Sequence, residues 1–252
     1  MVLNCAHRGA SAYYPENTML AFRKAIELGC DAIETDIHVS KDGRLVLIHD
    51  DKVDRTTNKK GDVKDYTFKE LERMGVPSLE QLIVLAKRYG IILNLELKSG
   101  PEWYDGIEEK IVEAVKRYHI IDTTIISSFN HYALVKCKEL CPQIQIGLIY
   151  VEAIYKPEKY CEYAGAEAIH PFYLTLTNQE VEALHGAGFK VRPFTVNSEG
   201  ALRRMIEMDV DMIITDYPDR LKRILKGYKM MSLETVYVTS KIDSMAGRNT
   251  LI

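Results

Sequence analysis

Short β-rich runs alternate with stretches of helical periodicity along most of the chain, and this alternation constrains the fold more than any other feature. Such βα repeats build parallel sheets covered by helices, and eight of them predict a closed (β/α)₈ TIM barrel. In that fold, functional side chains gather at the carboxyl ends of the strands. The eight candidate strands are Val2–Ala6, Ala32–Val39, Ile92–Leu97, Thr123–Ser127, Ile144–Ile149, Ala168–His170, Val191–Val196 and Met212–Thr215.

The helical stretches between these runs carry recognisable start and stop signals. Phe22 and Ile26 lie four residues apart, on one helical face, and the pattern stops at Gly29, a typical residue just past a helix end. Ser78 precedes Gln81 by three residues, which is the spacing of a capping box at a helix start. Helices with such boundaries fit between consecutive parallel strands.

One further β-rich run, Leu45–His49, breaks the alternation. Only residues 40–44 separate it from the preceding strand, and a parallel crossover needs a much longer connection. We therefore predict an antiparallel β-hairpin after the second barrel strand, which returns His49 to the level of that strand's carboxylates. Residues from about 50 to 76 are polar, and we expect them to form a small insertion over the site.

Composition limits the possible classes of protein. With 252 residues and 46% apolar content, the chain can bury one large core, and we expect one catalytic domain over residues 1–227. The formal charge of −3 gives no sign of a nucleic-acid surface. Residues 228–252 have little helical period and are expected to be an appendage. Whether it is flexible, packs under the barrel or contacts a second subunit of a homo-oligomer is left open.

Two properties favour a cytoplasmic protein without stable membrane insertion. The five cysteines are odd in number and scattered, which is typical of reduced thiols. The first motif begins within seven residues of the first methionine, and no apolar run is long enough to span a bilayer.

Three carboxylates are the candidate metal ligands. Glu34 and Asp36 lie two apart in one predicted strand and face the same way, as do Glu96 and Lys98 in another. Neighbouring carboxylates repel one another unless a cation or a proton intervenes. We favour one hard divalent cation, Mg²⁺ or Ca²⁺, because all three ligands offer oxygen. The alternative is a set of structural salt bridges in which Lys98 pairs with Glu96.

Two histidines and two cationic side chains complete this inventory. His7 follows an apolar strand and His49 ends another, so both are expected at the barrel mouth, where they can move protons. Arg8 and Lys98 can hold an anion between them. His170 also ends a candidate strand, and its position gives a weak indication that it faces the mouth. Cleavage of a phosphodiester requires such a combination of acid–base groups, a cation site and side chains that bind an anion.

These residues resemble the glycerophosphodiester phosphodiesterase family, over roughly residues 2–225 and with the motifs in the same order. The motifs are His7-Arg8-Gly9 with Pro15-Glu16-Asn17-Thr18, Glu34-x-Asp36, His49-Asp50 with Arg55-Thr56-Thr57, Leu95-Glu96-Leu97-Lys98, Ser127-Ser128-Phe129 and Thr215-Asp216-x-Pro218. The resemblance implies a TIM barrel with a small insertion after its second strand. It also implies hydrolysis of glycerophosphodiesters, such as glycerophosphocholine or glycerophosphoethanolamine, to sn-glycerol 3-phosphate and an alcohol.

The resemblance assigns a role to each matching position. It makes His7 and His49 the acid–base pair, Glu34, Asp36 and Glu96 the ligands of one Mg²⁺ or Ca²⁺ ion, and Arg8 and Lys98 the phosphate contacts. Phe194 stands where such enzymes commonly have Trp before Thr-Val-Asn. It keeps an apolar wall against the substrate but lacks the indole donor, which bears on the preferred leaving group.

Several alternatives stay open at this point. We assign His7 as base and His49 as acid, but the reverse order is also possible, and the nucleophile is either water or the glycerol 2-hydroxyl. A lysophospholipase D type activity on acylated diesters would need an apolar channel or a membrane-facing patch. A non-catalytic barrel that binds glycerol phosphates is the third possibility, although the intact histidines and carboxylates argue against it.

Overall fold

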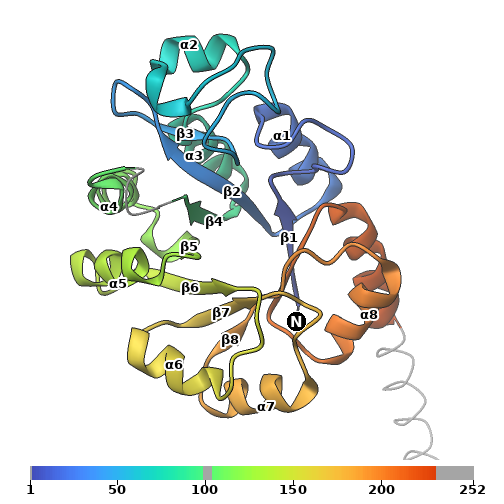
Figure 1. Cartoon of the computed structure of the whole chain (residues 1–252). Helices are drawn as coiled ribbons and strands as arrows, with labels where there is room; N and C mark the ends of the chain where they lie inside the picture. Colours follow the sequence, from blue (N-terminus) through green and yellow to red (C-terminus); the bar gives the residue numbers. More distant parts are fainter. Residues whose placement is uncertain (1, 99–103, 231–252) are drawn as a thin grey trace, which may run out of the picture.

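The computed structural model describes residues 2–98 and 104–230 and shows a parallel β-barrel ringed by helices (Figure 1). Its strands follow the order β8-β7-β6-β5-β4-β2-β1-β9, with β3 paired to β2 outside this path. The predicted TIM barrel is therefore confirmed. The barrel strands are β1 (Leu3–His7), β2 (Ala32–Val39), β4 (Ile92–Leu97), β5 (Thr124–Ser128), β6 (Gln145–Tyr150), β7 (Ala168–Pro171), β8 (Lys190–Val191) and β9 (Met212–Thr215).

The barrel closes between β8 and β9 through single backbone hydrogen bonds. The N–H of Ile214 donates to the carbonyl of Pro193 at 3.0 Å, and the N–H of Val196 donates to the carbonyl of Ile214 at 2.9 Å. The prediction of a continuous strand over Val191–Val196 was wrong, because the regular strand covers only Lys190–Val191. Pro193 has no N–H to donate and interrupts the ladder.

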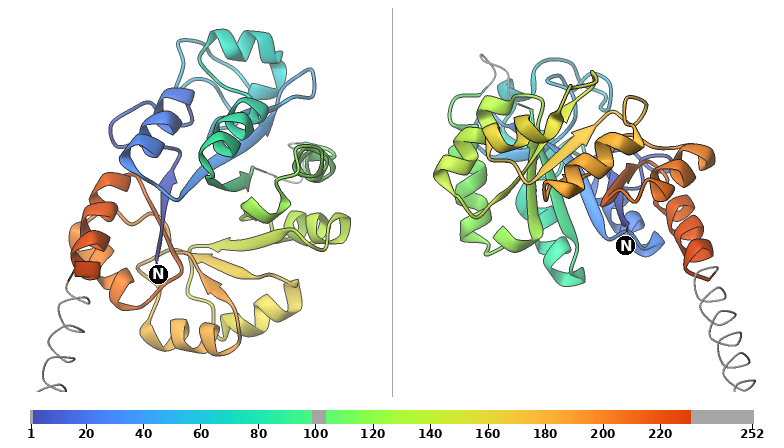
Figure 2. Two further views of the ribbon diagram at one scale, coloured as in Figure 1. Left: turned by 180° about the vertical axis from the view of Figure 1, so that it is seen from behind. Right: turned by 90° about the horizontal axis from the view of Figure 1, so that it is seen from below.

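Helices surround the barrel on its outer face (Figures 1 and 2). They are α1 (Met19–Leu28), α3 (Leu79–Tyr89), α4 (Ile107–Arg117), α5 (His131–Leu140), α6 (Pro157–Ala164), α7 (Asn178–Gly186), α8 (Glu199–Glu207) and a final helix over residues 218–230. The predicted boundaries are confirmed, since Gly29 ends α1 in a left-handed conformation and Ser78 forms a capping box with Gln81.

The final helix continues past Gly227 to residue 230, so residues 228–230 are helical although the sequence from residue 228 shows little helical period. The rest of the predicted appendage, residues 231–252, lies outside the described residues. The proposed division of the chain into a domain over 1–227 and an appendage therefore stays a prediction.

The predicted hairpin is confirmed. Strand β3 (Leu45–Leu47) runs antiparallel to β2, with Ile37 opposite Leu47 and Val39 opposite Leu45. The insertion that follows projects from one side of the barrel and contains a short 3₁₀ turn, Val63–Asp65, and helix α2 (Phe68–Arg73) (Figure 2, cyan). Its apolar residues form a separate small core: Val46, Ile48, Val53, Val63, Leu71 and Val76, with Tyr66, Phe68 and Met74 packed against them.

Apolar side chains fill the lower part of the barrel, and polar ones lie above them. Cys5, Ala32, Ile125, Met212 and Ile214 form a buried cluster, while the outward faces of the strands pack against the helices in one large core. All five cysteines are buried free thiols, in line with the expected reduced state. Among residues 2–98 and 104–230, we find no helix that is both long and apolar enough to cross a membrane.

Gly9 gives a direct test of how tightly the first loop packs against α1. Its φ of +83° is a left-handed conformation, and an added Cβ would lie 2.7 Å from the carbonyl carbon of Ala21. Gly90 has a similar φ of +68° but no heavy atom within 4 Å of its added Cβ, so Gly90→Ala is the matched control. We expect Gly9→Ala to lower the free energy of unfolding in urea by about 1–3 kcal/mol more than Gly90→Ala. Equal losses would contradict this packing.

Candidate active site

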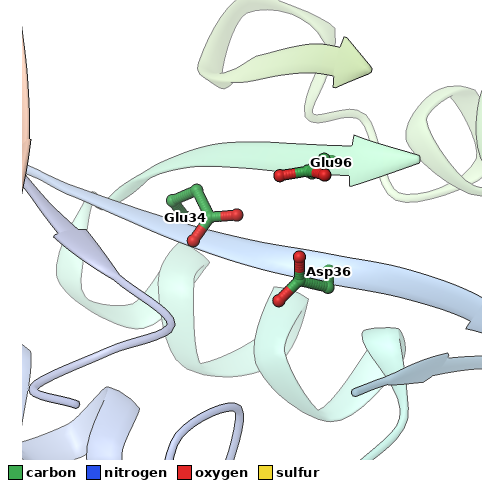
Figure 3. A group of neighbouring side chains, drawn as sticks. All are labelled: Glu34, Asp36 and Glu96. Carbon is green, nitrogen blue, oxygen red and sulfur yellow. The ribbon is translucent and has the colours of Figure 1, made fainter. Parts of the chain in front are cut away.

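Three carboxylates meet on the adjacent strands β2 and β4, at the level where β1 and β4 end (Figure 3). Glu34 and Asp36 come from β2, Glu96 comes from β4 directly opposite Asp36, and one oxygen of each lies within 4.8 Å of the others. The side chains are almost fully buried, at 2% exposure for Glu34, 0% for Asp36 and 9% for Glu96. The structure therefore brings the three predicted ligands together.

Two cationic side chains lie against this carboxylate cluster. The Lys98 Nζ is 3.0 Å from Asp36 Oδ1 and also pairs with Glu96. The Arg8 Nε is 3.4 Å from Asp36 Oδ2, and the Arg8 backbone N–H donates to Glu34 Oε2 at 2.9 Å. The salt bridges of the alternative interpretation are thus present, and they involve the same carboxylates that are the candidate metal ligands.

The donor set fits a hard divalent cation. Three ionised carboxylates exceed the two cationic side chains by one formal negative charge. Glu34 Oε1 is buried and has no hydrogen-bond partner within residues 2–98 and 104–230. Oxygen ligands of this kind suit Mg²⁺ or Ca²⁺. The charge and the chemistry of the donor set therefore suit a divalent cation.

Burial and neighbouring charges together give the three carboxylates different pKa values. Burial raises the pKa of Glu34 to about 8, and the charge of Asp36 adds to this effect. Burial and the charge of Asp36 also raise the pKa of Glu96. Burial acts on Asp36 as well, but the charges of Lys98 and Arg8 outweigh it and lower the pKa of Asp36 to about 2. Glu34 is therefore the carboxylate that holds a proton near neutral pH when no cation is bound.

The raised pKa of Glu34 predicts that the stability of chelator-stripped protein depends on pH. The folded-state pKa of Glu34, about 8, lies above its ordinary value of 4.5, so the folded state binds the proton more tightly. The resulting stabilisation is complete below 4.5 and is lost as the pH rises towards 8. We expect the thermal midpoint in EDTA to fall across this window, and to fall less in Glu34→Gln. A midpoint that rises with pH in both proteins would contradict these shifts.

His7 is fixed by a carboxylate from the far end of the chain. Its Nδ1 is 2.6 Å from Asp216 Oδ1, and its Nε2 is 3.9 Å from Glu34 Oε2. Asp216 is itself held by the Ser11 hydroxyl at 2.9 Å and by the Asn197 amide at 2.5 Å. Burial opposes protonation of His7, but Asp216 and Glu34 outweigh it and raise the pKa of His7. The ring is oriented with Nε2 towards the carboxylate cluster.

His49 has a similar arrangement on the opposite side of the mouth. It follows β3, and its Nδ1 is 2.6 Å from Asp50 Oδ1. Arg55 donates from Nε to Asp50 Oδ2 at 2.7 Å and from Nη2 to Glu16 Oε1 at 2.7 Å. The His49 carbonyl oxygen lies 3.1 Å from Nε2 of the buried His38. The predicted hairpin and insertion thus deliver and fix this histidine.

Phe194 lies in an aromatic cluster near the end of β8. Its ring centroid is 6.1 Å from that of Phe129 and 6.3 Å from that of Phe172. Phe194 also lines a small cavity together with Glu34 and Glu96. The three rings come from the loops after β5, β7 and β8, and the role of Phe194 as a wall beside the substrate stays a prediction.

Three further residues belong to this site, although the sequence assigned them no role. Asp50 and Asp216 hold the two histidines, and Asn17 donates to Asp36 Oδ2 at 2.7 Å. All three stand inside the motifs quoted above. Asp216 directly follows a predicted strand, so the rule that site residues follow strand ends could have identified it.

Comparison with known proteins agrees with this geometry. A sequence model described as the glycerophosphoryl diester phosphodiesterase family matches residues 7–220. The chain belongs to this family. It is therefore an enzyme of the phosphoric diester hydrolase class.

Known relatives match this chain over most of its length and over nearly all of their own. The glycerophosphodiester phosphodiesterase of Bacillus altitudinis is 40% identical over 240 residues, covering 89% of this chain and 98% of the relative. That of Caldanaerobacter subterraneus subsp. tengcongensis is 41% identical over 234 residues, covering 88% and 96%. An Oleispira antarctica phosphodiesterase, solved in complex with the product sn-glycerol-3-phosphate, aligns with a TM-score of 0.78 and 29% identity over 88% of this chain and 96% of its own.

Proposed function

We propose that this enzyme hydrolyses glycerophosphodiesters, such as glycerophosphocholine and glycerophosphoethanolamine, to sn-glycerol 3-phosphate and an alcohol. The observation that carries the proposal is the pair of imidazoles, each held by a carboxylate at Nδ1, on either side of three buried carboxylates. The Oleispira relative, which holds sn-glycerol-3-phosphate, supports the product. The five free thiols support a cytoplasmic location.

We assign Glu34, Asp36 and Glu96 as ligands of one divalent cation, Mg²⁺ or Ca²⁺. When bound, this cation would act as a Lewis acid that offsets negative charge on the phosphoryl oxygens. Arg8 and Lys98 lie against the same carboxylates and would contact the phosphate through N–H groups that their ion pairs leave available. Phe194 would form the apolar wall beside the substrate.

The two histidines perform the proton transfers. In neutral His7, an Nδ1–H that donates to Asp216 leaves the lone pair on Nε2, and this nitrogen takes the proton of the nucleophile. A new P–O bond forms as the bond to the alcohol breaks. His49, held by Asp50 at Nδ1, acts as the acid and donates a proton from Nε2 to the departing alkoxide oxygen. The raised pKa of His7 supports its role as base, because Asp216 and Glu34 stabilise the imidazolium that results.

A substrate without the 2-hydroxyl separates the two candidate nucleophiles. If water attacks directly, a diester of 2-deoxyglycerol phosphate is hydrolysed at a rate comparable to that of the natural diester. If the glycerol 2-hydroxyl attacks, this analogue is inert, and a five-membered cyclic phosphate appears transiently in ³¹P NMR spectra of the normal reaction.

The substrate class is tested by following release of the alcohol, choline or ethanolamine, from glycerophosphocholine, glycerophosphoethanolamine and lysophosphatidylcholine. We expect turnover of the first two and little of the acylated diester, because the apolar residues of the insertion pack into its own small core. Preferred turnover of lysophosphatidylcholine would instead support the lysophospholipase D activity. Binding of glycerol phosphates without any turnover would support the non-catalytic barrel.

A further inference from the structure

His170 is a buried histidine below the proposed catalytic groups. It lies on β7 with 1% exposure, and neither ring nitrogen has a hydrogen-bond partner within residues 2–98 and 104–230. Burial and the nearby charge of Arg192 lower its pKa well below the ordinary value, so the ring is neutral and carries a single N–H. As weakly expected from the sequence, His170 lines the same small cavity as His7, Glu34 and Phe194, although its ring is buried inside the barrel. A buried polar ring without a partner costs free energy, so its presence calls for an explanation.

The cavity beside His170 is the size of one water molecule. Its volume is about 20 Å³, compared with the roughly 10–15 Å³ that one water needs. His170, Glu34, Glu96 and Asn94 line it. Two of these residues have buried acceptors without a partner in the described chain, namely Glu34 Oε1 and Asn94 Oδ1. A ring with one N–H donor and two residues with orphaned acceptors thus line a single small space.

Gly147 on β6 provides the room for the imidazole. A Cβ added to Gly147 would lie 2.3 Å from His170 Nε2, a distance that only movement of the ring can relieve. The backbone of Gly147 has no positive φ, so the glycine is needed for space. The imidazole therefore packs directly against the β6 backbone at Gly147.

We propose that His170 is a positioning residue for the cation site, acting through one water molecule in this cavity. The ring N–H of His170 donates to the water, and the water donates to Glu34 Oε1 and Asn94 Oδ1. The water then keeps one lone pair, and Asn94 Oδ1 gains a partner. Glu34 Oε1 accepts from the water with one lone pair and keeps the other for the cation. These bonds fix the rotation of the Glu34 carboxylate, whose Oε2 already accepts the Arg8 N–H. The inference rests on the proposed role of Glu34 as a metal ligand.

Cation binding by chelator-stripped protein tests this role. Isothermal titration calorimetry with Mg²⁺ would compare wild type with His170→Leu, which keeps bulk but loses the donor, and His170→Gln, which keeps an N–H. We expect His170→Leu to weaken Mg²⁺ binding by about 10-fold or more, and His170→Gln to stay within about 3-fold of wild type. Unchanged Mg²⁺ affinity in His170→Leu, with only a lower thermal midpoint, would show a purely structural role and overturn the inference.

A second variant tests the inference even if His170→Leu does not fold. Gly147→Ala displaces an intact imidazole, so it should weaken Mg²⁺ binding in the same way, and normal Mg²⁺ affinity in folded Gly147→Ala would overturn the inference. Measurements on wild-type protein distinguish failure of this inference from failure of the proposed function. If wild type binds Mg²⁺ and hydrolyses glycerophosphocholine, loss of the His170 effect overturns only the present inference. If wild type binds no Mg²⁺ or other divalent cation, both fail together.

Discussion

Replacing His7 or His49 by alanine should lower kcat by about 10²- to 10⁴-fold, the usual contribution of a positioned acid or base. Both imidazoles lie at the barrel mouth with Nδ1 held by a carboxylate 2.6 Å away, so each offers only Nε2 for proton transfer. Loss of His7 removes the base for the nucleophile, whereas loss of His49 leaves the alkoxide without a proton donor. Steady-state hydrolysis of glycerophosphocholine measures both effects.

The control for these variants is a histidine away from the mouth. His119 is exposed and has a φ of +53°, a conformation that asparagine also tolerates, so His119→Asn should retain full activity. Circular dichroism and thermal unfolding would establish that the folds are intact. A folded double variant, His7→Ala/His49→Ala, that still turns over substrate at the wild-type rate would refute the proposed acid–base pair.

Substituting Asp36 should have a comparably large effect, through the cation. Asp36 is fully buried between Lys98 and Arg8, and it is the carboxylate whose pKa stays low, at about 2. Asp36→Asn removes the ligand charge and also leaves two cationic side chains without their shared partner. We expect Mg²⁺ affinity to fall by more than about 100-fold and kcat to fall with it, since loss of a residue that only hydrogen-bonds to a ligand already costs about 10- to 100-fold.

Calorimetric Mg²⁺ titration and activity at several Mg²⁺ concentrations measure this loss. The matched control is Asp122→Asn, which neutralises an exposed carboxylate far from the cluster and should change neither quantity. Because Asp36→Asn also disturbs two ion pairs, its thermal midpoint is needed as well. Full Mg²⁺ affinity in a folded Asp36→Asn protein would exclude Asp36 as a ligand.

Local chemistry explains why much of the site could be predicted from the sequence. Glu34 and Asp36 share a strand face through their spacing of two residues, and strand ends in a parallel barrel meet at one rim. The short connection after Val39 allowed only an antiparallel return, which correctly placed His49 near that rim. These inferences needed only the periodicity of strands and the length of one loop.

The features that could not be predicted from the sequence depend on contacts between segments that are far apart in the chain. His7 and Asp216 are 209 residues apart in sequence, so their hydrogen bond exists only once β9 closes the barrel beside β1. The shortened β8 depends on how Pro193 meets β9, which strand propensity alone does not describe. The position of His170 over Gly147 likewise follows from packing between neighbouring strands.

The most direct test of the central claim is hydrolysis of glycerophosphocholine by metal-stripped protein, with Mg²⁺ or Ca²⁺ added back and sn-glycerol 3-phosphate followed over time. We expect no release by the stripped protein and restored release with one of these cations. Full release by protein shown to be free of metal would contradict the role assigned to Glu34, Asp36 and Glu96. No release with any cation would contradict the proposed substrate class.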